Sequence, residues 1–285
     1  HLGKGYNFVW GSVKQSLLFN GNHNSNLEDF DVYLDYQKYS FKSEKRDLGG
    51  YGILKNKNVI LGMDIGTAPE SKFSENYQSG PLSFEAIYKG RKIICNSGYY
   101  QNTKKNLNLI SRSTAAHSTL ILNNNSIVSF KKNFRNKILN KSNFNTLNKN
   151  IVCEKNYWLI KCSHDGYLKN YGTIHERSLE FFPEKNKFVG TEKLIKNKNF
   201  IPTNFDIRFH LMPTTKVTKT QDKNTILIEL ENSAWRFYSV NGSIDVETGL
   251  YFGNKNNYLE NQNIFISGLT EKDDQVIKWE ITKIE

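Results

Sequence analysis

The chain has 285 residues, a formal net charge of +11 at pH 7 and a mean hydropathy of −0.60. This length suits one large β domain with a small extension, or two ordinary domains, so burial of a core is not limiting. The sequence opens at His1 without a methionine, and no apolar run reaches the ~18 residues of a membrane span. Neither a signal peptide nor a transmembrane helix is predicted, and we expect the chain to be part of a longer one.

The basic charge leaves two interpretations open. Lys and Arg number 39 against 28 Asp and Glu, which favours polyanionic partners such as nucleic acid, anionic membrane surfaces or acidic polysaccharide. Most of the excess is lysine interspersed with asparagine, as in residues 55–58 and 196–199. Biased genome composition produces the same pattern, and charge runs are usually solvated loops.

Several common chemistries have no motif in this sequence. Cys95, Cys153 and Cys162 show no paired or CxxC spacing, so neither a zinc knuckle nor a disulfide framework is predicted. Cys95 and Cys162 lie within or beside apolar runs, and we expect buried free thiols there. The absence of a Gly-x-Ser-x-Gly elbow, a P-loop and a dinucleotide fingerprint argues against hydrolase, kinase and dehydrogenase functions. No RNP-like or helix-turn-helix pattern supports nucleic-acid binding.

The first 48 residues are the only part of the chain with a helical period. Residues 13–19, followed by Asn20-Gly21-Asn22, predict a short helix with a stop signal. Residues 26–30 predict one further turn. We therefore expect residues 1–48 to form a helical tail or linker that precedes a separate β domain.

From residue 49 to residue 285 the pattern predicts an all-β domain, a large antiparallel β-sandwich with helix confined to single short turns. Short β-rich runs recur between Gly and Asn turns, which is typical of a sandwich rather than of βαβ units. Residues 82–88 and 91–95 predict a hairpin, because Gly90 supplies the positive φ of a tight turn. Residues 119–122 and 126–130 predict a second hairpin. Further strands are expected at residues 59–63, 158–162, 178–182, 187–192, 205–211, 225–230, 235–240, 263–267 and 275–282, and an irregular loop at 131–149.

A set of short segments spread over this domain resembles one protein family. The segments are Gly50–Leu54, Leu82–Tyr88, Asn96–Gly98, Arg112–Leu120, Ser163–Tyr167, Ile174–Arg177 and Arg208–Leu211. They are similar to the C-terminal β-sandwich of the heparinase II/III family of polysaccharide lyases. The resemblance implies a bacterial protein, periplasmic or extracellular, that acts on an acidic polysaccharide such as a glycosaminoglycan. It also implies a sandwich that packs against an upstream α/α toroid, with no membrane insertion and no nucleic-acid partner.

The implied reaction is β-elimination at a uronic acid, which needs groups that neutralise the carboxylate, a base and an acid. His117 is the strongest candidate. The family has a histidine in this Ala-His-Ser/Asn-Thr position at the start of a sandwich strand, where it faces the toroid and in some members helps to hold a metal. The alternative is that His117 caps a strand by a hydrogen bond to a backbone carbonyl.

The rest of the family pattern differs in this chain. Many members have a His-x-His-x-Asp run before the Leu-Ser-Phe strand, and the same places hold Asn76, Gln78 and Gly80. A later aspartate of the family is replaced by Asn96. Because neutral amides are poor zinc ligands, we predict no metal and no other cofactor. Asn76, Gln78 and Asn96 are either donors to a substrate carboxylate or ordinary turn residues.

Three more residues are candidates for substrate binding. Arg112 can pair bidentately with a carboxylate or sulfate, or it forms a structural ion pair with Glu85 or Asp64. Tyr99 and Tyr100 lie in a predicted loop, where exposed rings would offer stacking faces to sugars.

The remaining histidines have structural interpretations beside chemical ones. His164 and His175 are expected at opposite ends of a short connection between strands. Asp165 beside His164 suggests acid–base chemistry, whereas the Asp165-Gly166 pair is explained more simply as a turn. His210 is expected to be a hydrogen-bonded histidine within a strand.

These observations support three hypotheses of different classes. The first is one wall of a lyase cleft whose base, a tyrosine, lies on the upstream toroid. The second is a catalytically silent carbohydrate-binding or scaffolding module, because amides stand where the family has stronger groups. The third is a basic surface protein that binds other polyanions, which rests on charge alone.

Overall fold

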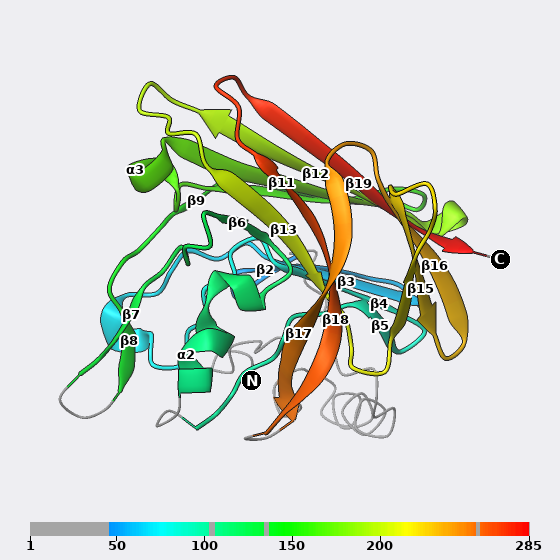
Figure 1. The fold of residues 1–285 in the computed structure, drawn as a ribbon, viewed down its shortest axis with the longest axis horizontal. Coiled ribbons are helices and arrows are strands. Elements are labelled where there is room, and N and C mark those ends of the chain that lie inside the picture. Colours follow the sequence, from blue (N-terminus) through cyan, green and yellow to red (C-terminus); the bar gives the residue numbers. More distant parts are fainter. Residues whose placement is uncertain (1–45, 103–105, 134–136, 255–256, 285) are drawn as a thin grey trace.

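The computed structural model describes residues 46–102, 106–133, 137–254 and 257–284 (Figure 1). The helix predicted at residues 13–19 and the turn at 26–30 lie outside the described residues. The strands are β1 (Asp47–Leu48), β2 (Tyr51–Lys55), β3 (Val59–Asp64), β4 (Phe84–Tyr88), β5 (Arg91–Ile94), β6 (Leu120–Leu122), β7 (Phe130–Lys132), β8 (Ile138–Asn140), β9 (Thr146–Cys153), β10 (Trp158–His164), β11 (Thr173–Phe182), β12 (Lys187–Lys196), β13 (Asn204–His210), β14 (Lys216–Lys219), β15 (Thr225–Leu230), β16 (Ser233–Ser239), β17 (Ser243–Asn254), β18 (Asn257–Leu269) and β19 (Gln275–Ile284). The helices are α2 (Asn106–Arg112) and α3 (Leu168–Tyr171), with 3-10 turns η1 (Ser71–Phe73), η2 (Thr114–Ala116) and η3 (Pro183–Lys185).

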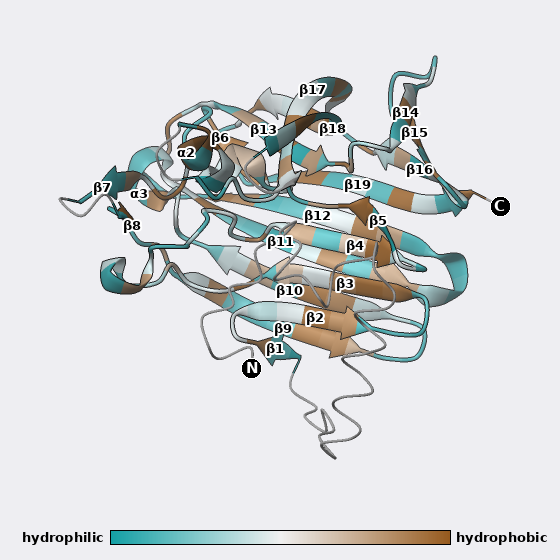
Figure 2. Ribbon diagram, turned by 90° about the horizontal axis from the view of Figure 1, so that it is seen from below, coloured by the Kyte–Doolittle hydropathy of each residue, from teal (hydrophilic) through white to brown (hydrophobic). Residues whose placement is uncertain are grey.

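The strands form an antiparallel sandwich, as predicted. One layer is an eight-stranded sheet in the order β14-β15-β16-β19-β12-β11-β10-β9. The opposite layer is made of a five-stranded sheet, β1-β2-β3-β4-β5, and a four-stranded sheet, β17-β18-β13-β6 (Figure 2). An isolated bridge between Cys95 and His210 joins these two smaller sheets. Strands β7 and β8 form a separate two-stranded sheet.

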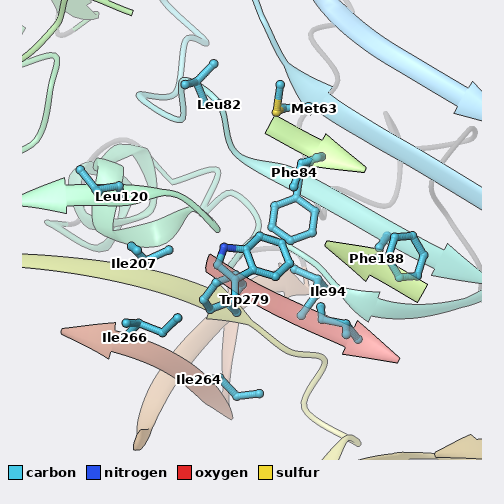
Figure 3. Close-up of a cluster of buried hydrophobic side chains, with 14 of the residues drawn as sticks. Met63, Leu82, Phe84, Ile94, Leu120, Phe188, Ile207, Ile264, Ile266 and Trp279 are labelled. Carbon is cyan, nitrogen blue, oxygen red and sulfur yellow. The ribbon is translucent and has the colours of Figure 1, made fainter. Parts of the chain in front are cut away.

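The core is centred on Trp279 of β19, where the three larger sheets meet (Figure 3). Its ring stacks on Phe84 of β4 at a centroid distance of 5.4 Å and meets Phe209 of β13 edge-on at 4.8 Å. Phe237 of β16 lies 5.9 Å from the same ring. Because aromatic rings bury large areas and interlock with defined geometry, this cluster fixes the start of β4 against the eight-stranded sheet. The loop that precedes β4 carries the candidate site.

The predictions for the β4–β5 hairpin and for two of the cysteines are confirmed. Strands β4 and β5 form the expected hairpin, and both of its turn residues, Lys89 and Gly90, have positive φ (45° and 78°). Such a turn matches the twist of the paired strands. Cys95 and Cys162 are buried free thiols, as expected, while Cys153 is a free thiol at the surface.

The second predicted hairpin is wrong. Asn123 and Asn124 do reverse the chain with positive φ, but β6 pairs with β13 instead of with residues 126–130. The backbone N–H of Ile127 donates to the Thr114 hydroxyl and that of Val128 to the Ser79 hydroxyl, both at 3.0 Å. Side chains from distant loops thus satisfy donors that a strand partner would otherwise satisfy.

Two further expectations are corrected. Residues 131–149 contain β8 and parts of β7 and β9, and β9 is mostly exposed at the edge of its sheet, so it lacks the apolar alternation that identifies a buried strand. Helix α2 is longer than a single turn, and the side chains that it buries are Asn108, Ser111 and Arg112. Because this inner face is polar, no apolar helical period marks it. No helix among the described residues is long and apolar enough to cross a membrane.

Gly190 of β12 provides a test of the core. A Cβ atom at this position would lie 2.0 Å from the ring of Trp279. We predict that Gly190→Ala lowers the free energy of unfolding by about 2–3 kcal/mol, because overpacking displaces the ring on which the sheets meet. Urea unfolding measures this. Thr191→Ala, on the same strand at a half-buried position, is the control and should change it by roughly 0.5 kcal/mol. Equal effects of the two substitutions would contradict the packing argument.

Candidate functional site

A pocket of about 190 Å³ lies between the start of β2, the end of β3 and the loop that leads to β4. Its described lining residues are Gly49, Gly50, Tyr51, Asp64, Gly66, Thr67, Pro69, Asn76, Tyr77, Gln78, Gly80 and His117. The structure thus brings together three residues singled out from the sequence, Asn76, Gln78 and His117. It adds two that were not singled out as site residues, Asp64 and Tyr77.

His117 enters the pocket as a neutral imidazole. Its side chain is buried, and its Nδ1 lies 2.8 Å from the carbonyl oxygen of Ser113. Because a carbonyl only accepts hydrogen bonds, Nδ1 carries the proton and Nε2 keeps its lone pair. Burial lowers the pKa of His117 to about 4, so the ring is uncharged near neutral pH. His117 therefore offers a hydrogen-bond acceptor or a weak base, and the capping contact expected from the sequence sets its tautomer.

Gly80 determines how close the chain comes to this ring. A Cβ atom at position 80 would lie 2.4 Å from Cδ2 of His117, which is far inside van der Waals contact. The family aspartate expected at this place does not fit beside His117 in its present position. The glycine at position 80 and the position of the His117 ring are therefore linked, because a side chain at position 80 would displace the ring.

Arg177 of β11 holds two of the segments that line the pocket, the loop before β4 and the segment that contains His117. Its Nη1 donates to the carbonyl oxygens of Leu82 and Ser118, each at 2.7 Å. Ser118 follows His117 directly. Leu82 follows Gly80 closely and has a φ of 58°, a left-handed conformation that costs energy for a side chain other than glycine. The guanidinium group thus stabilises a strained turn at the pocket and fixes the backbone beside His117.

A chain of buried side chains supports Arg177. Its Nε donates to Glu192 Oε1 at 2.8 Å, and Trp279 Nε1 donates to the same oxygen at 3.0 Å. His175 Nε2 lies 2.7 Å from Glu192 Oε2, and His175 Nδ1 lies 3.2 Å from Nε2 of His164. Since the carboxylate accepts, each histidine donates from Nε2 and accepts at Nδ1, and both are neutral.

The expected placement of the two histidines is confirmed. His164 ends β10 and His175 lies near the start of β11, on either side of the short connection between these strands, and the two face each other as register partners. Both are fully buried, and Asp165 bonds the backbone N–H of Asn145 at 2.7 Å. The cluster is structural. Glu192, which organises it, was not predicted because no local pattern links it to His175.

Asn96 lies outside the pocket lining and supports the backbone behind it. Its Oδ1 accepts from the N–H of Ser118 at 2.7 Å, and its own backbone N–H donates to Glu85 Oε1 at 3.1 Å. The side chain is 1% exposed. Its oxygen therefore positions the residue after His117.

Arg112 makes neither of the ion pairs considered for it. Glu85 pairs instead with Lys92 at 3.0 Å, and Asp64 forms no salt bridge with Arg112. The Arg112 side chain is buried, and its Nη1 donates to the carbonyl oxygen of Tyr77 at 3.0 Å. It therefore supports the pocket wall from behind.

The two tyrosines differ in exposure. Tyr99 is half-buried, and its hydroxyl accepts a hydrogen bond from Arg112. Tyr100 is 2% exposed and packs edge-on against Phe252, so the expectation of an exposed stacking face is wrong for this ring. His210 is hydrogen-bonded on both nitrogens, as predicted, to the Ser97 hydroxyl and the Ala115 carbonyl, each at 3.0 Å.

Asp64 and Tyr77 bring further polar groups to the pocket. Asp64 Oδ1 accepts from the N–H of Gly66 at 2.9 Å, and burial raises the pKa of this carboxyl to about 7. The Tyr77 hydroxyl and Gln78 Oε1 are buried and have no hydrogen-bond partner among the described residues. One sequence signal could have revealed Asp64: it continues the apolar run 59–63 as a charged residue within a buried strand.

The comparison with known protein families decides the assignment. Residues 41–280 match the model described as heparinase II/III-like, C-terminal. The chain belongs to this family. No match was found among curated protein sequences.

Solved structures of similar fold agree with this assignment. A heparan sulfate lyase HepC from Pedobacter heparinus superposes with a TM-score of 0.71 at 16% identity, over 93% of this chain and 42% of that one. A heparinase III with methylated lysines superposes with a TM-score of 0.67 at 15% identity, over 96% and 42%. At these identities the likeness concerns the fold. The heparinase II/III-like chain thus spans less than half the length of the enzymes it matches.

The residues present do not fit the zinc ion that some members of the family hold. Among the described residues, no group of three His, Cys, Asp or Glu side chains lies close enough to bind a metal. Of the places discussed above, only His117 retains a strong ligand. The oxygen of Asn96 is engaged by the backbone of Ser118.

We predict that zinc does not bind here in stoichiometric amounts, because one imidazole with neutral amides lacks the charge and basicity of a stable site. Elemental analysis of protein purified without chelators measures the zinc content. A tightly held zinc ion that is lost in His117→Ala, but kept in His210→Gln, would contradict the prediction.

Acid should destabilise the protein. Burial lowers the pKa of His117 to about 4 and that of His210 to about 3, so below their usual value of 6.5 the unfolded chain takes up protons that the folded chain does not. Burial by itself would raise the pKa of Glu192, but Arg177 and His175 outweigh it and lower this pKa to about 2, which adds a loss below its usual 4.5. Asp64, with its raised pKa, opposes them by taking up a proton on folding between pH 7 and 4.

Together these four groups predict that the free energy of unfolding falls by about 3 kcal/mol from pH 7 to pH 4, at about 1.4 kcal/mol per unit of pKa shift. Burial also lowers the pKa of His164 and His175, which adds to the loss, and raises that of Glu85, which opposes it. Urea unfolding at a series of pH values measures it. In Asp64→Asn the opposing contribution is removed, so the loss should be larger. Equal stability at pH 7 and pH 4 would contradict the histidine assignment.

Proposed function

We propose that this chain forms one wall of the cleft of a polysaccharide lyase that acts by β-elimination on a uronic-acid-containing polysaccharide. The observation that carries the proposal is His117, whose tautomer is set by Ser113 and whose Nε2 is available in a pocket lined with polar groups. The similar structures are named heparan sulfate lyase and heparinase III. Those names support a glycosaminoglycan as the substrate class.

The reaction makes specific demands on the pocket. A base removes the proton beside the uronate carboxylate, the C–H electrons form a C=C bond, and the glycosidic oxygen leaves with a proton from an acid. His117 is a weak base in the free protein. A substrate carboxylate bound nearby would raise the pKa of His117, because a negative charge favours the protonated ring. His117 thus becomes a competent proton carrier when an acidic sugar is bound.

The other lining residues suit hydrogen bonding to a sugar. Asn76 and Gln78 supply amide groups, and Tyr77 supplies a hydroxyl. We propose that the opposite wall of the cleft, with a catalytic tyrosine, comes from an α/α toroid upstream of this chain, with residues 1–48 as the connection. A periplasmic or extracellular location is part of the same proposal, since the polysaccharides concerned lie outside the cytoplasm.

A catalytically silent carbohydrate-binding module is the second candidate. It is favoured by Asn76 and Gln78, which can donate hydrogen bonds but cannot act as acids or bases near neutral pH. Turnover separates the two functions, because a binding module leaves the polymer intact.

We predict that the full-length protein containing this chain cleaves acidic polysaccharide, whereas residues 1–285 alone do not. In the full-length protein His117→Ala should lower the rate by about a hundredfold or more, the usual contribution of a positioned acid–base group. The ultraviolet absorbance of the unsaturated product measures turnover. Glu75→Gln, an exposed residue outside the pocket lining, is the control and should keep the rate.

The lyase function would be rejected by a full-length protein that is inert on a panel of acidic glycans, or by a His117→Ala variant of unchanged rate. The binding-module function would then take its place.

A further inference from the structure

We propose that Asp64 is a charge gate for this pocket: its protonated carboxyl group admits an anionic sugar, and its ionised form excludes it. The identity of the ligand as an acidic sugar rests on the proposed function. The gate itself rests on the position and surroundings of Asp64.

Asp64 sets the charge of the pocket. Asp64 is the one carboxyl group among the described lining residues, which include no lysine or arginine. His117 is neutral near pH 7. The pocket is therefore uncharged when Asp64 is protonated and carries one negative charge when it is ionised. In a site removed from water, a second negative charge from a ligand is then strongly disfavoured.

The immediate contacts of Asp64 do little to stabilise its ionised form. The carboxyl is 9% exposed and accepts one short hydrogen bond, from the N–H of Gly66. No described lysine, arginine or histidine forms a salt bridge with it. The nearby groups on β2 and on the loop before β4 are Tyr51 and Tyr77, and Asp64 itself helps to raise the pKa of Tyr77. Burial is the largest cause of that raised pKa, so the Tyr77 phenol is uncharged throughout the range in which the gate operates.

The groups on the eight-stranded sheet do not reverse this balance. Lys149 of β9 favours the ionised form of Asp64, but its ammonium group lies 3.6 Å from the carboxylate of Asp47. Cys162 of β10 is a neutral thiol, because burial raises its pKa to about 12. Burial is the largest influence on Asp64, and its pKa of about 7 places the switch between protonation states within the physiological range.

Unpartnered polar atoms beside the pocket point independently to a ligand. The Tyr77 hydroxyl is buried without a hydrogen-bond partner among the described residues. An unmade hydrogen bond of this kind costs about 1–3 kcal/mol, which a ligand that accepts from this hydroxyl would recover. Protonated Asp64 adds a second O–H donor. Together they suit an acceptor with two oxygens, such as the carboxylate of a uronate.

The test is calorimetric binding of methyl glucuronide and of neutral methyl glucoside to the full-length protein at pH 6 and pH 8.5. A gate with a pKa near 7 predicts that the Kd for the glucuronide rises by about thirtyfold between these pH values, while the Kd for the glucoside stays constant. In Asp64→Asn most of this rise should be lost, and in the double variant Asp64→Asn/His117→Ala, which also removes the proton that the sugar carboxylate draws to His117, the Kd should be equal at both pH values. Glu75→Gln, which removes an exposed carboxylate from the loop before β4, should follow the wild type.

The wild-type protein gives a readout that needs no variant. Its infrared carboxyl signal should contain one group that titrates near pH 7 and disappears in Asp64→Asn. A glucuronide Kd that does not change with pH, a rise in Kd for Asp64→Asn as large as that of the wild type, or binding of neither sugar would each overturn the gate. Cleavage of polysaccharide with a flat binding profile removes only the gate, whereas gated binding without cleavage removes only the lyase function.

Discussion

A buried ion pair between Arg177 and Glu192 is the interaction on which the candidate site depends. Both side chains are fully buried, and charges in such a position are tolerated only when paired and hydrogen-bonded. Glu192 meets this condition through His175 and Trp279, and Arg177 meets it through the carbonyl groups of the opposite layer. The bonds that satisfy the guanidinium group are thus the same bonds that hold the pocket segments, so core stability and site geometry are coupled.

Desolvation acts on the pocket in two opposite ways. It lowers the pKa of His117 and raises that of Asp64, because burial disfavours the charged form of either group. Near neutral pH the imidazole is therefore uncharged and the carboxyl is close to half-protonated. A pocket built from groups of this kind responds strongly to the charge of its ligand. An anionic ligand would favour protonation of both groups, which is the state that proton transfer to a leaving oxygen requires.

The family assignment and the chemistry of the site have different foundations. The sandwich is retained at 16% identity to a heparan sulfate lyase, because a packed aromatic core and antiparallel pairing tolerate extensive substitution. Fold alone does not imply function. The sequence pattern predicts that Asn76, Gln78, Gly80 and Asn96 replace stronger groups of the family, and a Cβ atom at position 80 would lie only 2.4 Å from His117 Cδ2. The function proposed here therefore rests on His117 and its surroundings.

The sequence by itself determined the β-sandwich class, the hairpin turn at Lys89-Gly90 and the family, and it singled out Asn76, Gln78 and His117, which line one pocket. These features are local, because alternating apolar residues, turn-forming residues and short motifs depend on residues that are neighbours in the sequence. Only the tertiary structure decided that Asp64 shares a pocket with His117, that Glu192 pairs with Arg177, and that α2 buries a polar face. Such partnerships depend on how strands far apart in sequence are registered and stacked, and burial then sets the charge of each group. Neither the register and stacking of distant strands nor the burial of a side chain can be derived from a residue and its neighbours along the chain.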